Sequence, residues 1–435
     1  MKPMRIILLA VGAPALVLAQ PASERLSVED AVKVATAQSD VVRQSRERAR
    51  AADDAKLSFG AHMLPSVHVD EEAQRYTRPF TLPFAFPTPQ GPLTPTVRDR
   101  DTNTLVVSAV QPVLGLLHGS QDLVAASRTH DAAEAAVEVA ERTLSEEVET
   151  GYLRLFQSRA QEEIAKASQT QLSDQLGIAR TRFKVGVNTR ADLLRIQVAQ
   201  ANARLQQIQA QVQERVTRSN LLVALGRDPH DATVEFLEPT ALQNAELPSV
   251  DSQSAQAAAL QGRPEVKRAE AEASAAGYRQ NARLFELLPE VNLEAAYVNV
   301  QGQAFAPKVS DFIGVKAQWA VWEWGATFFN HRAAAHLATA ASLAADDQRR
   351  QVSVDASNKL ELASASKAAL EVAQATIAAA EEAYRVTDAL VKAGSATTTD
   401  LLDSQSALTQ AKLNWVRARY EQAIAIVALR RATGH

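Results

Sequence analysis

The sequence has no cysteine, few aromatic residues and, after its N-terminal segment, no long apolar run. The absence of cysteine excludes disulfides and a lipid-modified N-terminal cysteine, so stability must come from packing or oligomerisation. Aromatic residues make up only 5% of the chain, which is few for a compact globular core. Alanine, glutamine and leucine instead dominate long stretches, a composition that favours long helices. Because no run of about 18 apolar residues follows the N-terminal segment, the sequence predicts no transmembrane helix.

The sequence also lacks the charge of a nucleic-acid-binding protein and the motifs of an enzyme. The formal net charge is −4, so no broad basic surface is expected. No P-loop, dinucleotide-binding glycine motif or nucleophile elbow occurs, and the 8 histidines are scattered. His331 and His336 are five residues apart, which does not place both imidazoles on one helix face. We therefore expect no enzymatic activity, no cofactor and no metal site.

Residues 1–19 have the pattern of a secretory signal peptide. Lys2 and Arg5 precede the apolar run 6–19, which ends in the small-residue pattern Val17-Leu18-Ala19. A membrane anchor is the weaker alternative, because the run is short and is interrupted by a glycine and a proline. We therefore expect the mature chain to be exported.

An internal repeat dominates the rest of the sequence. The segment RFKVGVNTRADLLRIQVAQANARL, residues 182–205, returns as LVKAGSATTTDLLDSQSALTQAKL, residues 390–413, at an offset of 208. The same offset relates residues 103–226 to residues 311–434. Identical pairs in the quoted segments include Lys184 and Lys392, Gly186 and Gly394, Thr189 and Thr397, and Asp192 and Asp400. The second half of the chain therefore repeats the first.

The first half differs from the second by one insertion. Residues 42–67 match residues 266–291 at an offset of 224, so the first half holds extra residues before the next matching block. They fall in the proline-rich stretch 78–101, which predicts a long exposed connection between two strands. We expect each repeat to contain a helix, two strands and a long helical hairpin. The expected boundaries are 20–226 for the first repeat, 227–250 for a linker or equatorial segment, and 251–435 for the second repeat.

Short stretches in each half alternate between apolar and polar residues, with the period of a strand. In the second half these are residues 291–297 and 313–321. The first-half pair, 66–76 and 103–112, is less regular because acidic residues interrupt it. Four strands are predicted in total. Two tryptophans after the last strand could form a membrane-interface girdle, Trp322 and Trp324.

Most of the remaining sequence predicts helix. Residues 115–185 and 191–225 are rich in alanine, glutamine and glutamate, with apolar residues at helical spacing. A helix of roughly 70 residues would be about 100 Å long, so it needs partner helices along its length. The second stretch carries a coiled-coil-like seam of apolar residues, Leu194, Val198, Ala201, Leu205, Ile208 and Val212.

The repeated segment predicts the tip of a helical hairpin in each half. In the first half, Lys184 suits the last turn of a helix, where a cation favours the negative end of the dipole. Gly186 supplies a left-handed helix stop. Thr189 and Asp192 have the spacing of a capping box that starts the next helix. The second half has the same residue types at the matching positions.

Four strands are too few for a transmembrane barrel, for which about eight is the smallest number. Without a transmembrane helix, a β-barrel is the route by which this chain could enter a membrane. The chain would then share a barrel, with eight strands from a dimer or twelve from a trimer. Eight strands would be filled by their own side chains, whereas twelve would leave a lumen.

This combination resembles the TolC-like outer-membrane efflux protein family. The resemblance covers residues 26–435. It rests on the signal peptide, the Leu-Pro entry to each strand pair, the long helices and the repeated motif G-x-x-T-x-x-D-L-L. It implies a mainly α fold with a small β part. A trimer would form a 12-stranded outer-membrane β-barrel, with four strands from each chain, and a periplasmic α-helical barrel of coiled-coil helices.

The same resemblance implies a function and partners. Members of this family are passive exit ducts of tripartite efflux or secretion systems, gated at the periplasmic tip. Expected partners are outer-membrane lipid, a periplasmic adaptor (membrane fusion protein) and, through it, an inner-membrane pump, with no nucleic acid. The expected location is the outer membrane, with a large periplasmic portion. The alternative is a non-membrane periplasmic coiled-coil scaffold or adaptor, which would explain the helices but not the alternating strand segments.

The resemblance also places a pore constriction at the second-half tip, where Asp400 and Asp403 match carboxylates of the family. In a trimer they would form a ring of six carboxylates that favours cations and raises some of its own pKa values by mutual repulsion. Helix capping alone explains Asp400 but not Asp403, whose first-half counterpart is Arg195. An ordinary solvated helix face is the alternative.

Asp192 resembles a first-half tip carboxylate that some relatives hold with an arginine and a tyrosine. The matching positions here are Ala396 and Val391, so that lock is not predicted. Arg190 or Arg195 could replace it. The alternative is a closed tip held mainly by packing.

The hairpin turns resemble the surface of this family that contacts the helical hairpin of the adaptor. The alternative role for the tip leucines is to pack the hairpin on itself, and the two roles are compatible. The expected contact residues are Gly186, Val187, Thr189, Leu193, Leu194, Gly394, Thr397, Leu401 and Leu402.

Overall fold

The structure, a computed structural model, describes residues 24–186, 188–244, 246–248 and 250–434. The expected signal peptide lies outside the described residues. The chain divides into two compact units, each of which takes segments from both halves of the sequence. The first unit comprises the chain up to residue 39, residues 144–246 and residues 366–427, and the second comprises residues 40–143, residues 247–365 and the chain from residue 428.

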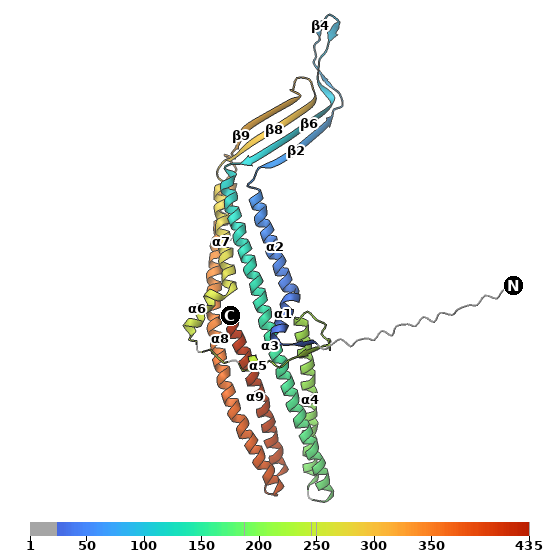
Figure 1. Cartoon of the computed structure of the whole chain (residues 1–435), viewed down its shortest axis with the longest axis vertical. Helices are drawn as coiled ribbons and strands as arrows, with labels where there is room; N and C mark the ends of the chain where they lie inside the picture. Colours follow the sequence, from blue (N-terminus) through green and yellow to red (C-terminus); the bar gives the residue numbers. More distant parts are fainter. Residues whose placement is uncertain (1–23, 187, 245, 249, 435) are drawn as a thin grey trace, which may run out of the picture. The chain divides into compact units, whose positions relative to one another are not determined.

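Two long helical hairpins account for about half of the chain (Figure 1). In the first hairpin, α3 (Gly115–Lys184) has 70 residues and α4 (Arg190–Ala224) has 35. In the second, α8 (Ala326–Lys392) has 67 residues and α9 (Thr398–Ala432) has 35. These bounds confirm the two long first-half helices predicted from composition and apolar spacing.

The turn inside each hairpin has the predicted chemistry. Gly186 and Gly394 both have a φ of +77°, a left-handed conformation that a residue with a side chain adopts only with strain. At the start of α4, the Thr189 hydroxyl accepts a hydrogen bond from the Asp192 backbone N–H at 3.2 Å. The Asp192 carboxylate accepts one from the Thr189 backbone N–H, also at 3.2 Å. The capping box predicted for the first hairpin is therefore confirmed.

The seam predicted on α4 is exposed. Leu194, Val198 and Leu205 have exposed fractions of 50%, 60% and 54%, and Ile208 and Val212 are exposed as well. A 3–4 spacing shows which residues share a helix face, but not which face the rest of the chain covers. The described part of the chain therefore leaves this face without a partner helix. The residues that α4 does bury are Ile196, Ala203, Leu221 and Leu222.

A short parallel sheet lies in the first unit. β1 (Glu24–Leu26) pairs with β7 (Val234–Phe236), and α1 (Val28–Gln38) follows β1. Residues 227–250, for which the sequence predicts no secondary structure, contain β7 and α5 (Thr240–Gln243). Strands of three residues carry too little alternation to be recognised from the sequence.

Tyr152 of α3 anchors the core of the first unit. Its side chain is fully buried, and its hydroxyl lies within hydrogen-bonding distance of the carbonyls of Leu26 (2.8 Å) and Leu237. Burial raises the pKa of this hydroxyl well above its usual range, so it remains protonated and can donate. The buried residues packed in this core are Leu26, Val28, Ala31, Ala35, Val148, Tyr152, Leu155, Leu221, Leu222, Leu225, Val234 and Phe236.

The second unit contains three further helices, α2 (Asp40–Ala61), α6 (Ser252–Gly262) and α7 (Pro264–Phe285). Pro264 stands at the start of α7, where its missing N–H would have had no partner within the helix. A small apolar cluster joins α6 and α7 to α8 through Ala259, Val266, Val352 and Ala356.

A buried ion network holds the joint between α6 and α7. The Arg263 side chain is 8% exposed and donates to the carboxylates of Asp355 at 2.6 Å and Glu265 at 3.0 Å. Arg431, near the end of α9, also pairs with Glu265 at 3.2 Å. Three elements of the second unit, α7, α8 and the end of α9, therefore meet at one charged cluster.

Four long strands form the main sheet, in the order β2 (Ser66–Arg75), β6 (Thr96–Pro112), β8 (Glu290–Gln303) and β9 (Val309–Gln318) (Figure 1). Every neighbouring pair is antiparallel. The four strands predicted from the sequence are confirmed, and β6 and β8 are longer than expected.

The predicted total of four strands is too low, because the structure also contains β1 and β7 and three more strands in the proline-rich stretch 78–101. β3 (Phe80–Thr81) pairs with β6, and β4 (Phe86–Thr88) pairs with β5 (Gly91–Leu93) in a small hairpin. Prolines inside β4 and β5 masked these two strands in the sequence, since proline usually indicates a break, and β3 has only two residues. The stretch still makes the predicted connection between β2 and β6.

Candidate functional site

One face of the main sheet carries more apolar residues than the other. Residues directly opposite each other in antiparallel strands share a face of the sheet. One row across all four strands is entirely apolar, whereas the next row, on the opposite face, is mixed. The first row is Val67, Ala109, Ala295 and Ile313, and the second is His68, Ser108, Ala296 and Phe312.

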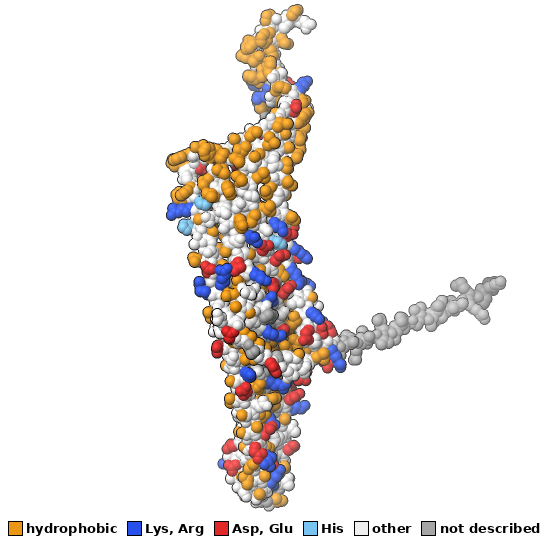
Figure 2. Space-filling model, turned by 60° about the vertical axis from the view of Figure 1, so that its left-hand side comes forward, with side chains coloured by type: hydrophobic (Ala, Val, Ile, Leu, Met, Phe, Trp, Pro, Cys, Tyr) orange, Lys and Arg blue, Asp and Glu red, His pale blue; other side chains and the backbone are white. Residues whose placement is uncertain are grey.

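The apolar face of the sheet is exposed. Val67, Ile313 and Val315 have exposed fractions of 70%, 81% and 70%. Figure 2 shows hydrophobic side chains gathered over the strands in this view, with the charged side chains concentrated over the helices. Neither β2 nor β9 pairs along its outer edge with another described segment. An apolar face and two open edges are the features of a sheet that needs a nonpolar environment and further strands.

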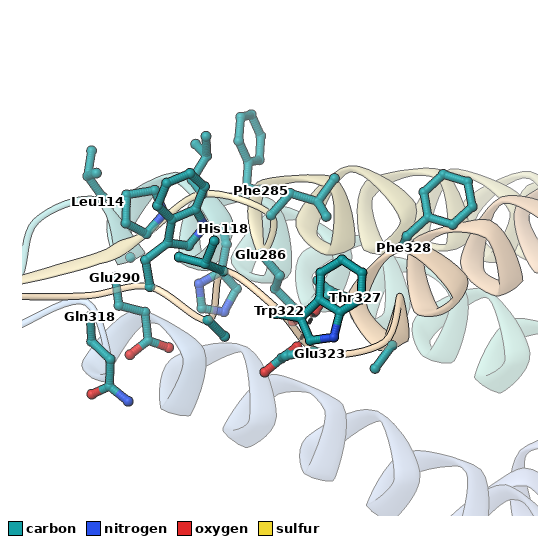
Figure 3. A pocket seen from close by; sticks show the side chains of 18 of the residues that line it. Leu114, His118, Phe285, Glu286, Glu290, Gln318, Trp322, Glu323, Thr327 and Phe328 are labelled. Atoms are coloured by element: carbon teal, nitrogen blue, oxygen red, sulfur yellow. Dashed lines mark hydrogen bonds between the residues drawn. The ribbon is translucent and has the colours of Figure 1, made fainter.

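A cavity of about 560 Å³ lies where β8 and β9 join the helices of the second unit (Figure 3). Its walls include Phe328 and Trp322, and beside them the Thr327 hydroxyl donates to the Glu323 carboxylate at 2.7 Å. The indole rings of Trp322 and Trp324 lie 5.6 Å apart, and these residues are 75% and 85% exposed. Exposed indoles next to carboxylates give this end of the sheet an amphipathic rim.

At the second hairpin tip, Asp400 is engaged in capping α9. Its carboxylate accepts hydrogen bonds from the Thr397 backbone N–H at 2.8 Å and the Thr397 hydroxyl at 2.7 Å. The Asp400 backbone N–H donates to the Thr397 hydroxyl at 3.2 Å. The backbone N–H of Thr397, and then its hydroxyl, favour the ionised carboxylate and hold the pKa of Asp400 below its usual range.

Asp403 has a different environment. It lies one turn further along α9, is exposed, and makes no hydrogen bond or ion pair with any described residue. No contact within the described residues therefore accounts for this carboxylate. Asp400 and Asp403 still share one side of the helix, because residues three apart are neighbours on a helix surface.

Arg195 joins the two hairpins within the first unit. Its guanidinium Nη1 on α4 donates to the hydroxyl of Thr399, in the first turn of α9, at 2.8 Å. Arg190 is exposed and has no hydrogen bond or ion pair in the part of the chain that the structure describes. Of the two arginines considered from the sequence, Arg195 is thus the one that contacts the other hairpin. Thr399 was missed, because no motif distinguishes it from its threonine neighbours.

The tip leucines divide into two groups. Leu193 and Leu402, from different hairpins, pack on the same small apolar cluster, whereas Leu194 is half exposed. Leu401 is partly buried. Val187, expected at the adaptor surface, lies outside the described residues. The three buried residues of the cluster are Leu176, Ala179 and Ile196.

The sequence pattern of the outer membrane efflux protein family matches residues 31–227 and 256–435. The chain belongs to this family. Membership assigns the protein to the outer membrane and agrees with the resemblance drawn from the repeated hairpin motif. None of the helices in the described ranges is both long enough and hydrophobic enough to cross a bilayer.

Individual relatives agree with this assignment. The chain is 27% identical over 289 residues to the outer membrane efflux protein BepC of Brucella suis biovar 1 (strain 1330). That alignment covers 65% of this chain and 61% of BepC, so it spans less than two thirds of the relative. The match does not extend over either whole protein.

Solved channel structures have the same fold as this chain. The outer membrane protein VceC of Vibrio cholerae matches with a TM-score of 0.79 at 16% identity, covering 94% of this chain and 96% of VceC. The CmeC outer membrane channel of Campylobacter jejuni matches with a TM-score of 0.78 at 14% identity, covering 99% and 94%. The mainly helical, TolC-like fold expected from the sequence is therefore confirmed.

Proposed function

We propose that this protein is the outer-membrane exit channel of a tripartite efflux or secretion system, a passive conduit for substrates delivered by an inner-membrane pump. The observation that carries the proposal is the four-stranded sheet, with its exposed apolar face and two unpaired edges. In a bilayer, such a sheet is stable only when further strands close its edges.

Three copies of the chain would supply the missing strands. Four strands fall short of the eight or so that a membrane barrel requires, and twelve strands leave a lumen that eight would fill. The exposed seam on α4 supports the same assembly, because apolar residues at coiled-coil spacing need a neighbouring helix. The long helices of the three copies would then form a helical barrel in the periplasm.

The proposed partners follow from the exposed surfaces. Outer-membrane lipid would cover the apolar face of the sheet, and the exposed indoles of Trp322 and Trp324 suit the boundary between lipid and water. A periplasmic adaptor would contact the hairpin tips, where exposed Leu194 and the turns at Gly186 and Gly394 offer a surface to a helical hairpin. The inner-membrane pump would act through that adaptor.

The proposed gate lies at the same tips. In a trimer, Asp400 and Asp403 would form a ring of six carboxylates, in which mutual repulsion opposes the effect of the Thr397 cap on Asp400. Such a ring favours cations over anions. Within each chain, the hydrogen bond from Arg195 to Thr399 ties one hairpin to the other and would help to hold the tip closed. Asp192 is occupied by its own capping box.

The decisive experiment measures single-channel conductance and ion selectivity of the detergent-extracted protein in a planar bilayer. The test variant is Asp400→Asn/Asp403→Asn, since asparagine keeps an acceptor for the helix cap while removing the charge. The control is Asp174→Asn, an exposed carboxylate on α3 outside the tip. We expect a cation-selective pore whose selectivity weakens in the double variant and not in the control.

Each other outcome removes a different part of the proposal. A pore indifferent to the double substitution would leave the channel and exclude the carboxylate ring. A folded trimer that forms no pore would exclude the channel and favour a periplasmic scaffold. For the lock, we expect Arg195→Ala to raise resting conductance and Arg190→Ala to leave it unchanged. Equal conductance in both variants would exclude the Arg195 contact as a lock.

A further inference from the structure

Arg142 of α3 joins the ends of two other helices in the second unit. Its guanidinium Nη1 donates to the backbone carbonyls of Gly434, which follows α9, at 2.9 Å and of Gly262, the last residue of α6, at 3.2 Å. A Cβ at Gly434 would lie 2.8 Å from the Gly262 backbone, so these two chain segments touch. Carbonyls at the end of a helix have no partner within it, and the helix dipole favours a cation there. We call the contact between Arg142, Gly262 and Gly434 the α3 joint.

The α3 joint brings together opposite halves of the repeated sequence. Arg142 belongs to the first half, whereas Gly262 and Gly434 belong to the second. The offsets of 208 and 224 residues give each of them a counterpart in the other half. The counterparts are Arg350 on α8, Gly226 after α4, and Gln38, the last residue of α1.

The helices agree with this correspondence. α1 and α6 both have 11 residues, α2 and α7 both have 22, and each pair begins 224 residues apart. In the first unit, a Cβ at Gly226 would lie 3.5 Å from the Gln38 side chain, so the ends of α1 and α4 also lie side by side. Gln38 and Gly226 are exposed, however, whereas Gly262 and Gly434 are partly buried. The first half therefore has the same pair of chain ends without the helix that covers them in the second half.

The two arginines differ in the same way. The Arg142 side chain is 30% exposed, whereas the Arg350 side chain is 68% exposed. Among the described residues, Arg350 pairs only with Asp347, three residues earlier on α8, at 3.3 Å. Arg350 thus has the residue type and the helix position of Arg142, but no backbone carbonyl to contact.

A contact beside the α3 joint shows the same difference between the halves. Arg431 donates to the Thr143 hydroxyl on α3 at 2.9 Å and pairs with Glu265 at 3.2 Å, and the two charged side chains are 23% and 14% exposed. The first-half counterparts of Arg431 and Glu265 are Val223 and Val41, which are 58% and 65% exposed. Valine at both positions indicates that an apolar surface covers them in place of an ion pair.

We propose that α8 of one copy of this chain docks on the ends of α1 and α4 of a second copy, where Arg350 donates to the carbonyls of Gln38 and Gly226. This rests on the assembly of identical copies in the proposed function. Since α3 meets the second-half ends of its own chain, the repeated contact of α8 falls on the first-half ends of the next. Val354, one turn beyond Arg350 and 58% exposed, covers Val223 of the neighbouring copy.

The sequence repeat is the reason to name a second copy as the occupant. The first-half ends match a surface that α3 already binds, and α8 is the described helix that repeats α3. An unrelated protein would have to reproduce the same arginine on the same helix face. A head-to-tail contact of this kind also closes into a ring when its rotation permits, with joints inside and between chains in alternation.

The direct test is cross-linking in detergent, for which the cysteine-free chain gives no background. The test variant is Val223→Cys/Gln351→Cys, and the matched control is Arg431→Cys/Thr143→Cys, which changes the corresponding pair inside one chain. With a short bismaleimide, we expect covalent multimers of the test variant on a denaturing gel and single chains of the control. Links confined to one chain, or no multimers from a protein that light scattering shows to be trimeric, would overturn the proposal.

Replacing Arg350 with methionine tests the proposed hydrogen bonds. Arg350→Met should raise the protein concentration at which the oligomer is half dissociated by at least about tenfold, because a charged donor to two carbonyls is lost. The control is Arg385→Met on the same helix, whose side chain is 71% exposed and pairs with Glu382, also three residues earlier. Its first-half counterpart, Gly177, has no other atom within 4 Å of a Cβ, so no joint is expected there. Equal dissociation of the two variants would exclude the Arg350 contact.

The outcomes also separate this proposal from the proposed function. Conducting trimers that show neither the cross-link nor the effect of Arg350→Met would exclude this joint and leave the channel. Covalent multimers that conduct no ions would support the joint and exclude the channel. A protein that stays a single chain in mild detergent would exclude both.

Discussion

Replacing Arg263 with methionine should destabilise the second unit by about 3 kcal/mol. The guanidinium is the main partner of two carboxylates, Asp355 at 2.6 Å and Glu265 at 3.0 Å, and its side chain is 8% exposed. Methionine keeps the apolar stem but leaves both carboxylates without this donor. Removing one member of a buried ion pair costs about 3–5 kcal/mol. The lower end applies here, because Arg431 still pairs with Glu265 and Asp355 is 37% exposed.

The matched control is Arg349→Met. Arg349 pairs with Glu270 at 2.6 Å, as short a contact as that between Arg263 and Asp355, but the two side chains are 48% and 46% exposed. Pairs exposed to solvent contribute about 0–1 kcal/mol. Chemical unfolding followed by helical circular dichroism, with hydrogen exchange read on α6 and α7, measures both variants. Equal losses in the two variants, or a loss below about 1 kcal/mol for Arg263→Met, would refute the burial argument.

The same network predicts how stability depends on pH. Burial disfavours the charged form of Glu265, but hydrogen bonds from Arg263 outweigh this and keep the pKa of Glu265 below its usual range. A folded-state pKa below the unfolded value of about 4.3 adds stability above that pH. This stability is lost as the pH falls through the folded-state pKa. Arg263→Met should therefore weaken the acid sensitivity of the second unit, as seen in unfolding curves collected from neutral to acidic pH.

Three further predictions concern the other parts of the chain. Tyr152→Phe should lower the unfolding free energy of the first unit by about 1 kcal/mol in thermal or chemical unfolding, because buried carbonyls lose a hydroxyl donor. Thr397→Ala should cost about 1 kcal/mol and speed hydrogen exchange in the first turn of α9, where its cap bonds are lost. In single-tryptophan variants, brominated lipids should quench Trp322 and Trp324 but not Trp415, which lies on α9. Quenching of Trp415 as strong as that of the other two would contradict the proposed membrane boundary.

Local pattern was sufficient to predict most of the secondary structure. The helices that begin at Gly115 and Arg190 follow from apolar spacing. The turn at Gly186 follows from glycine, the only residue type that adopts a φ of +77° without strain. The Thr189 capping box needs only four consecutive residues. In each case the interactions that decide the structure lie within one or two helical turns, so a single sequence contains them.

Contacts between distant segments could not be predicted in this way. Arg195 and Thr399 are 204 residues apart, and nothing in either local sequence indicates that they meet. Tyr152 is one of six tyrosines, and only the fold shows that β1 and β7 surround it. Gln405 looks like any other glutamine in a glutamine-rich helix until its burial is known. These residues depend on which faces come together, and this is decided by the packing of the whole chain.

Under the proposed trimer, the surfaces left open in the single chain have one explanation. The edges of β2 and β9 expose backbone N–H and C=O groups that another strand can pair, and the seam of α4 exposes side chains that another helix can cover. The strand edges need hydrogen-bond partners and lie in the second unit, whereas the α4 seam needs apolar contacts and lies in the first. Identical neighbours would meet both at once, because each copy brings the complementary edge and helix. A single chain therefore leaves these strand edges and this helix seam uncovered, whereas an assembly of identical copies would cover them.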